Sequence, residues 1–210
     1  MSRHYNQFAG QSPERLRGIS DGIFSVGMTL LVLGVAVPAA ESVKTEAALW
    51  NAIVHLAPSL LTYVMSFLTL GIFWVGQHAQ IQRLERSDRH LTWIMLGFLV
   101  FVTFIPFTTA LLARFIGYEV AVLVYWFNIF ALGAMLLASL TYAQRAKLFA
   151  SDDDSVAAVA AMRRRIYVAQ TLYGAATVLC VVSPYLSVTL IVLIQLNYAI
   201  APRVPILSRL

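Results

Sequence analysis

The polar residues inside long apolar stretches are the first candidates for chemistry in this sequence. Asp21 is the only charged side chain within any of these stretches, and Arg17 precedes it by four residues. An ionisable group at membrane depth needs a partner, and a residue four positions away shares the same helix face, so Arg17 is the nearest candidate. Two interpretations are open. Asp21 either anchors a helix start, where the helix dipole favours a carboxylate, or belongs to a functional site.

A stripe of apolar residues that carries one hydroxyl group follows Asp21. At 100° per residue, five side chains fall within about 60° of Val26 on a helix, namely Val26 itself, Thr29, Leu30, Leu33 and Val37. The stripe represents either ordinary packing or lipid contact, or it faces an axis that several copies of the helix surround. In the second case, apolar rings gate by dewetting, and a ring of Thr29 hydroxyls replaces part of an ion's hydration shell.

Motifs of enzyme and cofactor chemistry are absent from the sequence. It has no Walker A loop, dinucleotide-binding glycine motif, HExxH motif, cysteine pair or GxSxG elbow. The four histidines, His4, His55, His78 and His90, form no cluster with other ligand types, so we expect no metal site. The TVGYG filter of ordinary potassium channels is also missing. We therefore expect no enzymatic activity and no cofactor, and any ion selection must use side chains.

The composition indicates a membrane protein. Of the 210 residues, 60% are hydrophobic and 12% are charged, whereas a soluble domain has about 25% charged residues. A chain of this size has too little interior to hide so much apolar surface, which excludes a soluble globular enzyme. The high hydrophobic content also excludes a disordered segment. A disulfide-stapled domain is excluded because the chain has a single cysteine, Cys180. The net charge of +5 is better interpreted as a topology signal than as a nucleic-acid-binding signal.

Six apolar runs have about the length that a helix needs to cross the hydrocarbon core. Backbone groups in lipid must bond internally, so we expect helices. The sequence predicts an all-α, polytopic membrane protein with a single domain, 1–210, whose helices span about 19–37, 56–75, 91–113, 120–142, 163–182 and 185–200. Only Ser183 and Pro184 separate the last two runs, which predicts a tight helical hairpin. Asn128, Gln195 and Asn197 are candidates for hydrogen bonds between helices.

The distribution of Lys and Arg predicts the orientation. Thirteen of the 15 basic side chains lie in the two tails and in alternate loops, whereas only Lys44 and Arg114 lie on the other side. Basic residues accumulate on the cytoplasmic side of membrane proteins. We therefore expect both termini in the cytoplasm and an even number of crossings, in the plasma or inner membrane if the chain is prokaryotic.

Three motifs resemble a known family. The segment Arg15-xxx-Ile19-Ser20-Asp21-Gly22 resembles the RxxxFSDG signature at the start of the first helix of the transmembrane protein 175 family, the potassium channels of endolysosomes and prokaryotes, with Ile in place of Phe. The segment 73–78, which contains Trp74 and His78, resembles the end of the family's second helix. The segment 104–112 resembles its Pro-Phe-x-Thr-Ala stretch.

The resemblance implies a homotetramer of six-helix subunits whose first helices line a central pore, with potassium as the permeant ion. The resemblance implies that Val26 forms the constriction of the pore and that Thr29 and Leu33 follow it along the helix. The family usually has Ile or Leu at the position of Val26. The resemblance also implies a structural polar cluster that holds the pore helix in register without touching ions, formed by Arg15, Ser20, Asp21, Trp74 and His78.

The sequence thus predicts a potassium-selective or potassium-preferring channel in the lipid bilayer, with pore residues Val26, Thr29, Leu30 and Leu33. Two alternatives are open. A secondary transporter of a small ion or solute needs a polar site at mid-membrane, but no acidic residue lies there, which argues against proton coupling. The other alternative is a non-conducting membrane assembly protein.

Overall fold

The computed structural model describes residues 12–200. This part of the chain contains seven α-helices and two 3₁₀ turns, and its only β-type pairing is an isolated bridge between Leu84 and Phe149. The helices are α2 (Pro13–Val32), α3 (Glu46–His55), α4 (Ala57–Ile81), α5 (Arg89–Arg114), α6 (Glu119–Arg145), α7 (Asp153–Val178) and α8 (Pro184–Ile200), with the 3₁₀ turns η1 (Ala40–Ser42) and η2 (Leu179–Val181). The predicted all-α class is confirmed.

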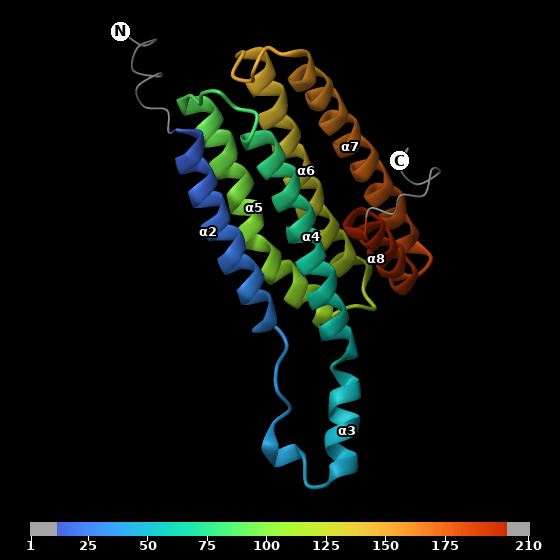
Figure 1. Ribbon diagram of the computed structural model, residues 1–210. Helices are drawn as coiled ribbons and strands as arrows, with labels where there is room; N and C mark the ends of the chain where they lie inside the picture. Colours follow the sequence, from blue (N-terminus) through green and yellow to red (C-terminus); the bar gives the residue numbers. More distant parts are fainter. Residues whose placement is uncertain (1–11, 201–210) are drawn as a thin grey trace.

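The long helices form a bundle in which successive members run in alternating directions (Figure 1). Helices α4, α5 and α6 are long and apolar enough to cross a membrane. Helix α2 packs on α4 and α5, and α5 packs on α6. Helices α7 and α8 form a hairpin that contacts α6 and α4, while η1 and α3 project beyond one end of the bundle (Figure 1).

Helix α2 begins and ends earlier than the predicted span, 19–37. Its start is set by Ser12, whose side chain accepts a hydrogen bond from the Arg15 backbone, and by Pro13 in the first turn. It ends at Val32, and Leu33 is the C-cap. The apolar run continues to Val37 as irregular chain. The helix stops before the run does because Gly34 disfavours a helix, whereas hydrophobicity alone does not mark the end.

Helix α4 is longer than the predicted 56–75, and a separate helix, α3, precedes it. Thr45 caps α3 by accepting a hydrogen bond from the backbone of Ala48. Pro58 lies in the first turn of α4, where proline is well tolerated. The helix continues to Ile81 because Gln77 and Gln80 are polar but compatible with a helix.

Helix α7 differs most from its predicted range, 163–182. It begins at Asp153, ten residues earlier, so that Arg163, Arg164 and Arg165 lie within a helix rather than at its start. Alanine-rich sequence favours a helix even where hydropathy is low. The other three helices lie within three residues of their predicted ranges, at 89–114, 119–145 and 184–200.

Candidate functional site

One face of α2 is packed into the bundle. Phe24 and Leu31 are 1% and 2% exposed, and the Phe24 ring lies 6.0 Å from that of Phe98 on α5. Gly27 lies between them, and a Cβ atom at this position would be 3.7 Å from Leu70 of α4. This is an ordinary van der Waals distance, so Gly27 lies at the contact of α2 with α4 without being required for it.

The opposite face of α2 is uncovered in the single chain. Val26, Leu30 and Leu33 are 57%, 45% and 74% exposed, and Thr29 is exposed between them. Leu33 stays on this face because its backbone is still helical, at φ −66° and ψ −18°. Val26, Thr29, Leu30 and Leu33 of the stripe predicted from periodicity thus form a continuous surface of the subunit, which we call the α2 outer face, whereas the fifth member, Val37, lies beyond the end of the helix.

The hydroxyl group of Thr29 is oriented by its own helix. It donates a hydrogen bond of 2.9 Å to the carbonyl oxygen of Val26, one turn earlier. A hydroxyl group has one donor and two acceptor lone pairs. Because the proton is directed to the helix, the oxygen of Thr29 is left as an acceptor on an exposed surface, which suits contact with a cation.

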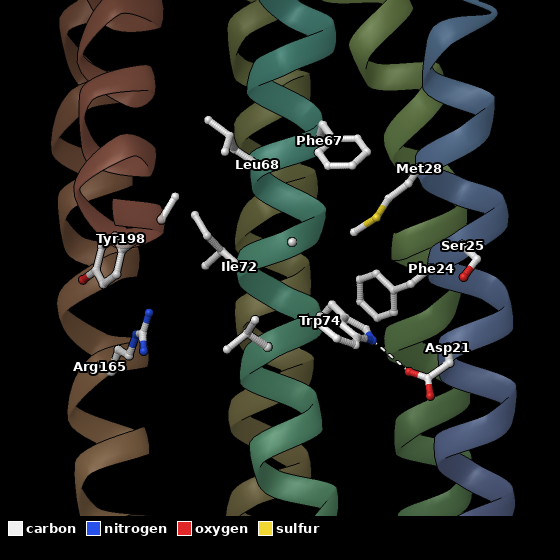
Figure 2. A pocket seen from close by; sticks show the side chains of 13 residues that line it. Asp21, Phe24, Ser25, Met28, Phe67, Leu68, Ile72, Trp74, Arg165 and Tyr198 are labelled. Atoms are coloured by element: carbon white, nitrogen blue, oxygen red, sulfur yellow. Dashed lines mark hydrogen bonds between the residues drawn. The ribbon is translucent and has the colours of Figure 1, made fainter. Parts of the chain in front are cut away.

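The polar cluster implied by the sequence is assembled in part. The indole nitrogen of Trp74 donates a 2.8 Å hydrogen bond to the carboxylate of Asp21 (Figure 2). The ring of His78, one turn further along α4, lies 5.4 Å from that of Trp74. These three residues connect α2 to α4. Asp21 therefore pairs with Trp74, and the expected pairing with Arg17 is wrong.

The structure places the other two members of the cluster elsewhere. Ser20 is 2% exposed, and its hydroxyl has no hydrogen-bond partner among the described residues. Arg15 is exposed near the start of α2. The cause is helical geometry, since Ser20 is rotated by about 100° and Arg15 by about 120° from Asp21 around the helix axis.

A buried hydroxyl network joins α4, α5, α6 and α8, and most of it was not predicted from the sequence. The Tyr125 hydroxyl lies 3.1 Å from Ser66 and 3.0 Å from Thr69. Thr109 donates to Ser66 at 2.6 Å, and the Gln195 amide donates to Thr69 at 2.7 Å. Only Gln195 was a candidate for such bonds. Serine and threonine occur throughout the apolar runs, so their types alone did not single out these positions.

At the end of the bundle where α2 begins, polar contacts join the α4–α5 pair to the α6–α7 pair (Figure 1). Arg83, in the α4–α5 connection, forms a 3.1 Å ion pair with Asp154 in the first turn of α7. Asp88 caps α5 by accepting from the backbone of Leu91 and also accepts a 2.6 Å hydrogen bond from Tyr142 of α6. No group of three or more potential metal ligands occurs among residues 12–200. These contacts fix the helix ends rather than form a site.

Comparison with known proteins identifies relatives. Residues 15–106 match the family described as "Endosomal/lysosomal potassium channel TMEM175". A potassium channel of Streptomyces collinus is 38% identical over 102 residues, which cover 49% of this chain and 48% of the relative. A potassium channel of Chamaesiphon minutus is 36% identical over 102 residues, which cover 49% and 50%. The chain thus spans about half the length of the curated relatives it matches.

The fold has a solved counterpart. The crystal structure of a lysosomal potassium-selective channel TMEM175 homolog from Chamaesiphon minutus superposes with a TM-score of 0.78 at 27% sequence identity. The match covers 91% of this chain and 98% of that one. The structural likeness therefore extends well past residue 106, where the sequence match to the family ends.

Proposed function

The chain is related to the TMEM175 family, as its first-helix motif predicted, and from this premise we propose that it is the subunit of a passive potassium channel. It is a multi-pass membrane protein, and its relatives are named as potassium channels. Ions move down their gradient without a nucleotide or a cofactor. The observation that carries the proposal is the α2 outer face, which is apolar, bears one hydroxyl group and is uncovered in the single chain.

The active form in this proposal is a homotetramer with six crossings per subunit and both termini in the cytoplasm. Within the chain, α2 packs mainly on α4 and α5 and lies at an edge of the bundle. An edge helix with one uncovered face can meet its symmetry mates around an axis. The alternating helix directions and the clustering of basic residues support the same orientation.

Ion selection in this proposal takes place along the α2 outer face. Val26 forms the constriction, Thr29 supplies a ring of hydroxyl oxygens, and Leu30 and Leu33 extend the apolar wall toward the end where α2 stops. Apolar rings close a pore by dewetting, and oxygen atoms replace ion hydration. The small Val26 leaves a wider constriction than the Ile or Leu that the family usually has.

Asp21, Trp74 and His78 hold α2 in register against α4 without touching ions in this proposal. Asp21 is rotated by about 140° from Val26 around the helix axis, so it points away from the α2 outer face. An unpaired carboxylate at membrane depth is costly, and the Trp74 indole supplies its hydrogen bond. Arg15 and Ser20 complete the sequence motif and contribute to the start of α2.

A flux assay with purified protein in liposomes tests the proposal. A channel gives fast potassium flux that does not saturate, together with unitary currents and a tetrameric mass in detergent. Slow, saturable flux would indicate the transporter alternative. A tetramer without flux under any potassium gradient would indicate an assembly protein.

A further inference from the structure

A groove of about 690 Å³ runs along the surface of α4, between α2 on one side and the α7–α8 hairpin on the other (Figure 2). Four of its polar side chains lie toward the end nearer to the start of α2, namely Asp21, Trp74, Arg165 and Tyr198, and Ser25 lies near the middle. The other end is apolar and lined by Met28, Phe67 and Leu68. The groove is therefore polar at one end and hydrophobic at the other, like a membrane lipid.

Arg165 is the only cation that lines this groove. Its guanidinium carbon lies 5.3 Å from the centre of the Tyr198 ring, and no carboxylate among residues 12–200 pairs with it. The Tyr198 hydroxyl is shielded from solvent and has no hydrogen-bond partner among the described residues. One charged donor and one hydroxyl donor thus line the groove, and neither has a hydrogen-bond acceptor in the part of the chain that the structure describes. A phosphate group accepts from both kinds of donor.

In the orientation proposed above, Arg165 lies toward the cytoplasmic boundary of the membrane. Tyr198 lies in the last turn of α8, and the basic side of the chain faces the cytoplasm in the orientation proposed above. Arginine at this level keeps its charge at the headgroup region, where anionic lipids of the cytoplasmic leaflet attract it. A second, smaller hollow between α4, α6, α7 and α8 meets the groove at Ile72, Val75 and Arg165. Apolar walls therefore extend from the arginine in two directions.

We propose that this groove binds an anionic glycerophospholipid, whose phosphate contacts Arg165 and Tyr198 and whose acyl chain lies along α4 on Leu68 and Ile72. The guanidinium group of Arg165, which has no carboxylate partner among residues 12–200, favours a phosphate-bearing lipid over a second copy of the chain. A second copy would have to bring an acidic side chain to Arg165 at the membrane boundary. The only acidic residue inside the apolar runs is Asp21, and one oxygen of its carboxylate already accepts a hydrogen bond from Trp74.

Native mass spectrometry of the delipidated full-length protein tests the proposal, with dioctanoyl phosphatidylglycerol and dioctanoyl phosphatidylcholine as probes. We expect one tight phosphatidylglycerol per subunit and weaker binding of phosphatidylcholine. Arg165→Gln should weaken the tight site by about tenfold, the loss expected for a charge-assisted hydrogen bond. Tyr198→Phe should weaken it less. Arg164→Gln is the matched control, since it removes the same charge from the adjacent, exposed position and should leave the tight site intact.

Three results would overturn the proposal. The first is equal binding of both lipids, and the second is an equal loss of binding in the Arg165 and Arg164 variants. The third comes from Ile72→Trp, which fills the groove. We expect this variant to keep the oligomeric mass and to lose the tight lipid. If it instead breaks the oligomer while the number of bound lipids is unchanged, a second copy of the chain covers the groove. None of these results depends on ion conduction.

Discussion

At the scale of single residues, Thr29 and Asp21 share a helix and have different environments. Thr29 is exposed, and its hydroxyl proton is directed to the Val26 carbonyl, so its oxygen is free for a cation. Asp21 carries a full charge but is engaged by Trp74. The neutral residue is therefore better placed to contact ions than the charged one, because the carboxylate is held at the α2–α4 contact.

Thr29→Val should weaken the preference for potassium over sodium. The substitution keeps the side-chain shape and removes one oxygen per subunit, worth on the order of 1 kcal/mol, so the permeability ratio should fall several-fold. Reversal potentials under bi-ionic conditions measure this ratio. Thr103→Val is the control, because Thr103 on α5 is also exposed and donates to the carbonyl oxygen of Val100 at 2.8 Å. Unchanged reversal potentials in the Thr29 variant would exclude the selectivity role.

Trp74→Phe should impair assembly more than conduction. It keeps a ring next to His78 and removes the donor to Asp21, which leaves the carboxylate without its hydrogen bond. We expect a loss of about 1 kcal/mol for this half-exposed pair, seen as a lower thermal midpoint and a smaller tetramer fraction in detergent. Trp93→Phe, at a 64% exposed position on α5, serves as the control. Equal midpoints for the two variants would mean that the Trp74 contact does not stabilise the fold.

At the scale of secondary structure, hydroxyl groups connect helices that hydrophobic contact alone would leave free to slide. In lipid, the apolar faces of helices gain little from meeting each other, so packing and hydrogen bonds determine their register. Tyr125 on α6 lies 3.1 Å from Ser66 and 3.0 Å from Thr69 on α4, and both Tyr125 and Ser66 are 0% exposed. The network fixes the position of α4, on which α2 packs, relative to α6.

Tyr125→Phe should destabilise the bundle by about 0.6–2 kcal/mol, because it leaves the Ser66 and Thr69 hydroxyls without their shared partner. Thermal unfolding of the purified protein measures this effect. Tyr118→Phe provides the comparison, since Tyr118 precedes α6 and is 68% exposed, and it should leave the midpoint unchanged. If both variants unfold at the same temperature, the network contributes no stability.

At the scale of the whole molecule, the central question is what covers the α2 outer face. Lipid, water and a second subunit are the three candidates, and they differ in whether water reaches the side chains. In the proposed tetramer the face borders an aqueous path. Leu31 and Leu33 lie two residues apart at the end of α2, on its buried and its uncovered face, and are 2% and 74% exposed. Cysteines at these two positions therefore compare the water access of the two faces at nearly the same depth.

Leu33→Cys should therefore react with a membrane-impermeant thiol reagent when the protein is in liposomes, and the reaction should reduce potassium flux. Leu31→Cys should react far more slowly, and the native Cys180 should stay unmodified because it is 1% exposed. The rates of modification are read by mass spectrometry. A Leu33→Cys variant that is as unreactive as Leu31→Cys would mean that lipid or protein, and not water, covers the face.

The sequence by itself determined the all-α membrane class, the resemblance to a channel family and the grouping of Val26, Thr29, Leu30 and Leu33 on one side of the first helix. These follow from short-range physics. Long apolar runs in lipid must be helical because their backbone groups have no other partners, and the 3.6-residue period orders side chains around a helix axis. Helix ends were less certain, as at α7, because hydropathy marks the lipid-facing part and not the whole helix.

Only the tertiary structure decided which groups meet across the bundle. Gln195 is 126 residues from Thr69, so no local spacing predicts their contact. Trp74 is 53 residues from Asp21, and the family resemblance placed the two in one cluster without specifying which atoms bond. The groove beside Arg165 also needs α2, α4, α7 and α8 in their relative positions. Composition and periodicity act along one helix, whereas hydrogen-bond partners and cavities depend on how separate helices are placed in space.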